Sequence, residues 1–285
     1  MSYRSTAIWY AFAGHSVGGA FVQLDGTVNA YHVGFTMGSP PVERRLLKYS
    51  AADGGIDQGY SLLPRKAVWE LFIKADTEAA YDARRDAIYR MFKPYEGPLT
   101  IRVDLAGAGE LRQLSAYVDG PVDFQQSQQF AYSSIVRVPL YCPEPLWYNP
   151  TLTTVQDTFS VSSFAFYYNG DYDEWPIVEI DGQVQDPTLS ITTSTAYRYE
   201  TAIIDLTGVT IPNAVTWTLD MRKKILTGAG GANETGKLVN PNWINFKLWP
   251  APYKAAGLNV FNQTWTSKNG NAKIRLKFNN RYLSY

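Results

Sequence analysis

The side chains best suited to catalysis are scarce in this sequence. It contains 2 histidines, His15 and His32, and 1 cysteine, Cys142. A Ser/His/Asp triad needs a histidine beside its nucleophile, but neither histidine lies near a Gly-x-Ser-x-Gly motif, and an isolated histidine is more often structural. A single cysteine excludes an internal disulfide and a metal site built from several thiolates. We therefore expect no enzyme activity, no catalytic residue, no cofactor and no metal site, and the sequence assigns no binding residue.

Two short motifs have the composition of ligand sites. Asp171-Tyr172-Asp173-Glu174 clusters three carboxylates, which suits calcium or a glycosidase acid/base pair. It lacks the glycine and distal glutamate of an EF-hand, and aspartates are common in turns because they bond their own backbone. Gly228-Ala229-Gly230-Gly231 is followed by neither a Lys-Ser/Thr pair nor a helix, as a phosphate loop requires. We interpret the first motif as a turn and the second as a flexible loop tip.

Aromatic residues make up 14% of the chain. Aromatic rings on a β-sandwich can stack against sugars, although core packing explains aromatics in strands equally well. The alternative function is therefore a carbohydrate-binding module for adsorption to a host surface, with four candidate platform residues: Trp243, Trp249, Tyr253 and Trp265.

Length and charge limit the remaining classes. The 285 residues favour two domains. Lys+Arg and Asp+Glu both number 26, so no overall field attracts nucleic acid or an anionic membrane. No apolar run approaches the roughly 18 residues of a membrane span. The apolar run Ala7–Phe12 is shorter than a signal-peptide core. We expect a soluble protein without nucleic-acid sequence recognition or membrane insertion.

The first half of the sequence combines strands with one helix. Short apolar stretches between glycines predict strands over Ile8–Met37, and the Pro/Gly-rich segment Ser39–Tyr60 predicts a protruding loop or hairpin. Lys66–Ala75 alternates with one apolar face, as in a half-buried strand. Asp76 and Thr77 can cap a helix over residues 77–92, in which apolar residues recur at helical spacing before Pro94.

A meander and a proline-rich exit follow the helix. Alternating runs predict strands at Leu99–Leu105, Leu111–Tyr117 and Ser133–Tyr141, with a long hairpin near Asp119–Tyr132. Three prolines between Cys142 and Pro150 stiffen the backbone. We expect a domain boundary there, giving domains 1–150 and 151–285.

The second half of the sequence has no helical periodicity. Runs rich in β-branched and aromatic residues, separated by Gly, Pro and Asn, predict short strands that form a sandwich or jelly roll. These runs are Val155–Phe166, Ile177–Ile180, Pro187–Thr193, Tyr197–Asp205, Val215–Met221, Ile244–Trp249, Leu258–Trp265 and Lys273–Arg281.

Several motifs in this order resemble the distal tail protein of long-tailed, non-contractile phages, over nearly the whole chain. The matching pieces are Pro64-Arg65, Tyr81–Arg85, Phe92–Leu99, Cys142–Pro145, Tyr168–Asp171, Trp175–Ile180, Leu219–Arg222 and Gly257–Val260. The stretch Leu248–Asn259 is longer than the family's Leu-x-Pro-Gly-x-Asn. Within these pieces we expect Gly170 at positive φ and Pro176 at the entry to an edge strand.

The resemblance implies a mainly β (α+β) fold and a structural role. Its N-terminal β-barrel or sandwich domain, with one helix and a protruding hairpin, would form a hexameric ring, and its C-terminal domain would be a galectin-like β-sandwich. Such a protein is a hub at the distal end of the virion tail, made in the bacterial host cytoplasm. Its implied partners are the tail tube protein, the tape-measure protein, the tail-tip or baseplate hub protein and receptor-binding proteins. Both edges of a ring subunit must bear complementary surface, and we expect Ser39–Tyr60 and Asp119–Tyr132 to supply part of it.

Overall fold

The chain folds into two compact units in the computed structural model. The structure describes residues 8–12, 21–24, 30–48, 55–94, 97–105, 110–126, 131–195, 198–250 and 257–283. The first unit comprises residues 1–148 together with 283–285, and the second comprises residues 149–282. The chain therefore leaves the first unit after Tyr148 and returns to it at Leu283.

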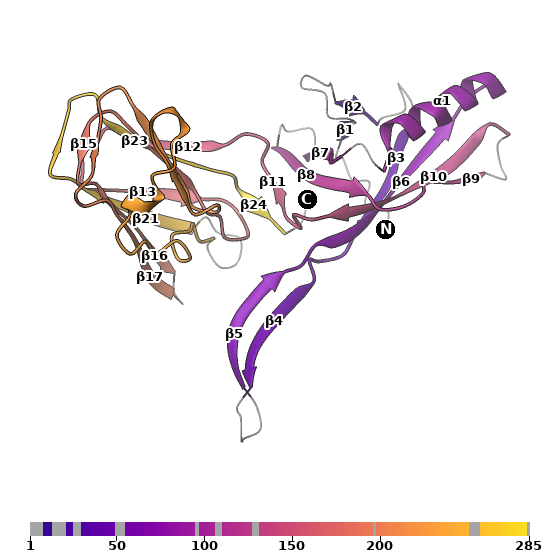
Figure 1. The fold of residues 1–285 in the computed structure, drawn as a ribbon. Helices are drawn as coiled ribbons and strands as arrows, with labels where there is room; N and C mark the ends of the chain where they lie inside the picture. Colours follow the sequence, from indigo (N-terminus) through magenta and orange to yellow (C-terminus); the bar gives the residue numbers. More distant parts are fainter. Residues whose placement is uncertain are drawn as a thin grey trace. The chain divides into compact units, whose positions relative to one another are not determined.

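The described residues of the first unit form antiparallel strands and one α-helix (Figure 1). Its main sheet has the strand order β2-β1-β7-β8-β10-β6-β3, with β9 paired to β10 and β11 to β8, while β4 and β5 form a separate ribbon. The elements are β1 Ile8–Phe12, β2 Val22–Gln23, β3 Tyr31–Met37, β4 Val42–Lys48, β5 Gly55–Leu62, β6 Arg65–Lys74, α1 Glu78–Met91, β7 Leu99–Leu105, β8 Glu110–Val118, β9 Asp123–Gln126, β10 Ser133–Cys142 and β11 Trp147–Tyr148.

The strand β6 builds the core of this unit through its alternation. Ala67, Trp69, Leu71 and Ile73 are buried, while the residues between them are more exposed. β6 pairs along its full length with β10, from Lys74 opposite Ser133 to Arg65 opposite Cys142. The half-buried strand that the alternating pattern predicts is confirmed.

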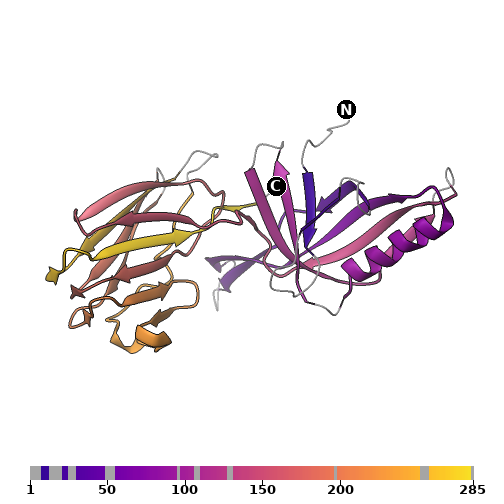
Figure 2. The ribbon, with the colours of Figure 1, turned by 90° about the horizontal axis from the view of Figure 1, so that it is seen from above.

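The helix α1 covers the buried face of β6 (Figure 2). Thr77 caps its start, since the Thr77 hydroxyl accepts the Ala80 N–H at 3.3 Å. Ile88 and Met91 face the sheet, and Phe92 packs edge-on against Trp69 with ring centroids 5.9 Å apart. The helix is one residue shorter at each end than the span of 77–92 expected from its caps and periodicity.

The second unit is a sandwich of antiparallel sheets. Its larger sheets have the orders β12-β23-β14-β19-β20 and β13-β21-β16-β17, and a small sheet has the order β18-β15-β22. The elements are β12 Thr153–Asp157, β13 Ser163–Tyr168, β14 Ile177–Asp181, β15 Val184–Gln185, β16 Thr188–Thr195, β17 Arg198–Asp205, β18 Thr210–Ile211, β19 Thr216–Asp220, β20 Ile225–Thr227, the 3-10 turns Ala229–Gly231 and Thr235–Lys237, β21 Gly257–Thr264, β22 Ser267–Lys268, β23 Lys273–Phe278 and β24 Arg281–Tyr282.

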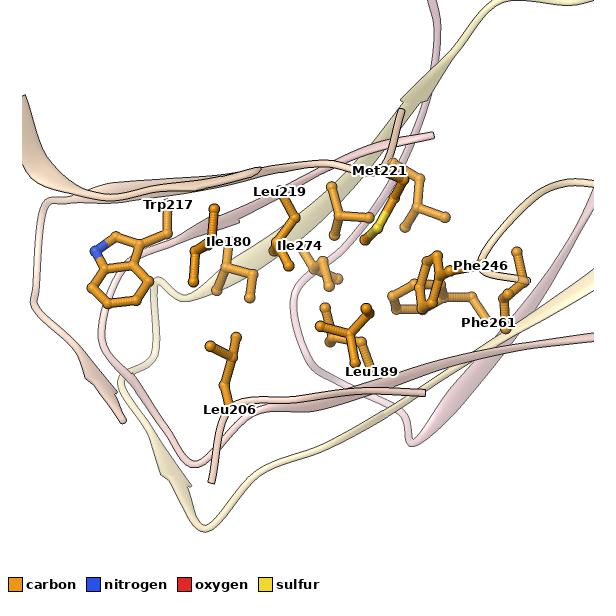
Figure 3. Close-up of a cluster of buried hydrophobic side chains, with 14 of the residues drawn as sticks. Ile180, Leu189, Leu206, Trp217, Leu219, Met221, Phe246, Phe261 and Ile274 are labelled. Atoms are coloured by element: carbon orange, nitrogen blue, oxygen red, sulfur yellow. The ribbon is translucent and has the colours of Figure 1, made fainter. Parts of the chain in front are cut away.

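The core of this unit lies between its two larger sheets (Figure 3). Ile180, Leu219 and Ile274 come from one sheet, Leu189 and Phe261 from the other, and all are buried. Burying each such side chain contributes about 1.5–3 kcal/mol. The mainly β fold with a C-terminal sandwich is confirmed.

Four local expectations from the sequence are wrong. Ile244–Trp249 forms no strand, because the Asn242 carboxamide accepts the Asn245 N–H at 3.3 Å and closes a turn. Val155–Phe166 is split into two strands where Phe159 adopts φ +52°. Pro176 precedes β14, which lies between β23 and β19 and is not an edge strand. Gly170 does not have positive φ; a Cβ there would lie 2.2 Å from the Tyr168 hydroxyl, so steric space requires the glycine.

Candidate assembly surfaces

The ribbon of β4 and β5, which we call the arm, projects from the first unit (Figure 1). Within the described part of the chain, these strands pair only with each other. Their seven and eight residues span about 25 Å at roughly 3.4 Å per residue. An isolated two-stranded hairpin is marginally stable in water. We therefore expect the arm to be stabilised by a partner that covers it.

The side chains of the arm support this interpretation. Val42, Leu46 and Tyr60 are 52%, 60% and 55% exposed, well above the level of core residues. Alternation along β4 places Val42, Arg44 and Leu46 on one face, and Tyr60 shares that face because it pairs with Arg44. A bulge follows, with Gly59 at φ +98°. One face of the arm thus carries apolar side chains with an arginine between them. The sequence predicted a protruding loop or hairpin here, without indicating which residues share a face.

The outward face of α1 is the second exposed surface of this unit. Glu78, Asp82 and Asp86 follow one another at four-residue spacing and are all exposed. Ala79 and Ala83 lie beside them on the same side of the helix and are also exposed. A shallow hollow next to this face is lined by Ala83, Asp86, Ala87, Arg90 and Met91. This face thus carries a row of carboxylates beside small alanines, with the exposed Arg90 at its C-terminal end.

The open face of the main sheet carries further exposed apolar residues. Tyr31, Val68, Tyr117 and Ile135 are between 37% and 45% exposed. A salt bridge crosses this face from Arg137 to the carboxylate of Glu70 at 2.9 Å. The open face of the sheet thus carries both apolar and charged side chains.

The predicted hairpin Asp119–Tyr132 contributes β9, and its residues 127–130 lie outside the described residues. Phe124 of β9 packs against Tyr89 of α1, with ring centroids 4.8 Å apart, and Arg85 lies 5.4 Å from the Phe124 ring. Phe124 is therefore used within the subunit to hold β9 against the helix.

His32 is partly buried and Cys142 is buried in the first unit. The Trp69 indole N–H donates to Nδ1 of His32 at 3.0 Å, and burial lowers the His32 pKa to about 4, so the ring is neutral at pH 7. Burial raises the pKa of the Cys142 thiol to about 11. His15 lies outside the described residues. Neither described side chain is poised as a base or nucleophile at neutral pH.

Arg65 lies beside Cys142 and is only 3% exposed. Its Nη1 donates to the carbonyls of Gly38 at 3.0 Å and Leu283 at 3.4 Å. Burial lowers the Arg65 pKa to about 10. The guanidinium therefore ties β6 to the segment that returns from the second unit.

The carboxylates of the Asp171–Glu174 motif bind cations of the protein. Glu174 bonds Arg222 at 3.0 Å and Arg281 at 2.9 Å, and Asp173 bonds Lys247 at 2.7 Å. The backbone N–H of Asp171 donates to the Arg281 carbonyl at 2.7 Å. Among the residues that the structure describes, no group of three His, Cys, Asp or Glu side chains is arranged to hold a metal ion.

The glycine-rich motif forms a tight turn. Gly230 and Gly231 adopt φ +62° and +83°, and the Gly228 N–H bonds the Ala232 carbonyl at 2.8 Å.

No described helix is both long and apolar enough to cross a membrane.

The candidate sugar-platform residues are distributed over the second unit. Trp243 and Trp265 pack against its core, and Trp265 meets Phe159 edge-on at 5.2 Å. Lys247 lies 3.9 Å from the Trp249 ring, and Tyr253, in the long Leu248–Asn259 stretch, lies outside the described residues. Core packing thus accounts for Trp243 and Trp265.

The comparisons with known proteins bear on the fold. No protein-family model and no curated protein matches the chain. The crystal structure of the Dit protein of phage SPP1, described as a paradigm of the hub adsorption apparatus in phages infecting Gram-positive bacteria, is similar over 96% of this chain and 98% of its own, with 12% identity and a TM-score of 0.62. Two structures of the phage p2 baseplate in its activated conformation, with Ca and with Sr, cover 95% of this chain and 97% of theirs at 6% identity, with TM-scores of 0.42 and 0.43. Across both units, this chain has the fold of the SPP1 distal tail protein.

Proposed function

We propose that this chain is a structural protein of a phage virion, a hub at the distal end of the tail. It assembles into a homo-hexameric ring through its first unit and has no catalytic role. It is made in the cytoplasm of the bacterial host. It joins the tail tube protein and the tape-measure protein to the tail-tip or baseplate hub protein, and it offers attachment points for receptor-binding proteins.

The arm is the observation that carries this proposal. It leaves more than half of Val42, Leu46 and Tyr60 exposed on a two-stranded ribbon that is marginal by itself. Burial in an assembly stabilises it by about 25 cal/mol for each Å² of apolar surface removed from water. The likeness of fold to the SPP1 hub protein, over almost the full length of both chains, supports the same kind of assembly. In this proposal, residues 1–150 form the ring and residues 151–285 form a domain that projects outward from it.

Sedimentation velocity tests the assembly. Deleting residues 43–58 should convert the ring to monomers, and so should Val42→Ser/Leu46→Ser/Tyr60→Ser, which keeps the backbone of the arm. The matched control is Tyr167→Ser/Ile203→Ser/Leu258→Ser, which changes residues of the second unit that are 64%, 48% and 41% exposed. This control should still form rings. A deletion variant that sediments like the wild-type ring would rule out the arm as the assembly element.

The alternative function, a carbohydrate-binding module, concerns the second unit. Its Trp175 borders a hollow of about 220 Å³ that Arg222, Lys277 and Asn279 also line. A glycan array probed with the full-length protein separates the two functions, because a structural hub gives no sugar-dependent signal.

A further inference from the structure

We propose that the arm of one copy docks on the outward face of α1 in the next copy. This inference rests on the proposed ring. The two sides of the repeated contact are the face of the arm formed by Val42, Arg44, Leu46 and Tyr60, and the helix face formed by Ala79, Asp82, Ala83 and Asp86.

The placement of the two surfaces fits such a contact. The arm leaves the main sheet on the side away from α1, so the two surfaces lie at opposite ends of the first unit (Figure 1). A contact between two different surfaces of identical subunits is head-to-tail, and it closes into a ring when the rotation per subunit allows. The arm and the helix of one subunit thus remain available for two different neighbours.

The shapes of the two surfaces match. The helix has small side chains where the arm would lie, because Ala79 and Ala83 flank its acidic row. Small residues allow a neighbouring backbone to approach the helix closely. The exposed side chains of Val42, Leu46 and Tyr60 can then cover the alanines and the hollow beside Ala87 and Met91.

The charges are complementary as well. Arg44 lies on the same face of β4 as Val42 and Leu46, and Lys48 is the last residue of that strand. The helix face presents Asp82 and Asp86, and the Asp82 side chain is 59% exposed with Arg85 3.6 Å away. Arg85 lies over the rings of Tyr81 and Phe124, which holds it towards the sheet. Asp82 is thus paired with Arg85 of its own subunit, but its exposed side and the exposed Asp86 leave room for a cation from another subunit. Complementary charges set the register of such contacts.

Charge reversal tests the contact. Arg44→Glu/Lys48→Glu and Asp82→Lys/Asp86→Lys should each raise the concentration at which rings dissociate by about tenfold or more, because each replaces attraction by repulsion between exposed groups. Combining all four substitutions in one chain should restore ring formation. Mixing the two double variants should also restore it, since alternating copies then pair Glu with Lys and Arg with Asp around the ring. Analytical ultracentrifugation measures all four samples, and circular dichroism verifies that each variant is folded.

The control is Lys223→Glu/Lys224→Glu, which changes two charges in the second unit and should leave the ring unchanged. The docking is wrong if Asp82→Lys/Asp86→Lys assembles like the wild type, or if the mixture of double variants stays monomeric. In either case the proposed function still stands, provided the wild type forms rings. A wild-type protein that is monomeric at all concentrations overturns both proposals.

Discussion

The Glu174 carboxylate offers a sharp test of how burial sets the strength of an ion pair. Arg281 and Arg222 bond the same carboxylate at 2.9 and 3.0 Å, but their side chains are 9% and 44% exposed. The Glu174 side chain is 7% exposed. The two arginines therefore share one partner, and their side chains differ in contact with water.

We expect Arg281→Met to cost far more stability than Arg222→Met. Removing one partner of a buried pair typically costs about 3–5 kcal/mol, because the remaining charge is left in a medium of low polarity. Exposed pairs contribute about 0–1 kcal/mol. The free energy of unfolding should thus fall by about 3 kcal/mol or more for Arg281→Met and by about 1 kcal/mol for Arg222→Met.

Urea unfolding, followed by tryptophan fluorescence, measures both values. The double variant Glu174→Gln/Arg281→Met is the control, because it leaves no lone buried charge and should recover part of the loss. Equal losses for the two arginine variants, or a larger loss for Arg222→Met, would refute the argument from burial.

Three further predictions concern single side chains. The stability of the first unit should fall as the pH drops from 6.5 to 4, because the pKa of folded His32 is about 4 and protonation therefore favours the unfolded state. Each unit of pKa difference corresponds to about 1.36 kcal/mol, and solvent screening of this partly exposed ring reduces the total loss to about 1–2 kcal/mol. Urea titrations at several pH values should show this loss for the wild type and not for His32→Asn. Cys142, buried and with its pKa raised to about 11, should react with a thiol reagent far more slowly in native buffer than in ~8 M urea, and equal rates would contradict its burial. Gly170→Ala should lower the free energy of unfolding by about 2–4 kcal/mol, because its Cβ displaces the Tyr168 hydroxyl from Tyr172 and Arg281; a neutral effect in thermal unfolding would contradict the overlap.

Local signals predicted the elements that depend on neighbours in sequence. The cap at Thr77 and the alternation of β6 are properties of a few adjacent residues, and both appear in the fold. The strand Leu99–Leu105 coincides with β7 for the same reason. The spacing of Ile244, Phe246 and Leu248 also resembled a strand, and the last two are buried, but the turn at Asn242 supplies that burial without a strand.

Contacts between distant residues could not be predicted in this way. The carboxylate of Glu174 was assigned to a turn, whereas the cations that pair with it come from residues 222 and 281. The sequence indicated a protruding segment at Ser39–Tyr60, but the face shared by Arg44 and Tyr60 depends on strand register and on the bulge near Gly59. Register is set by the hydrophobic pattern and the turn, and it is only weakly specified in strands that have no buried face, such as those of the arm.

The return of the chain to the first unit has a consequence for how the second unit is held. The chain passes between the two units at two places, after Tyr148 and before Leu283. Arg65 donates a hydrogen bond to the Leu283 carbonyl at 3.4 Å. The connection after Tyr148 is covalent, whereas the one at Leu283 depends on non-covalent contacts of that residue with the first unit, such as its hydrogen bond to Arg65. A single cut after Tyr148 therefore leaves the second unit attached to the first by non-covalent contacts alone, and a cut before Leu283 leaves the covalent connection in place.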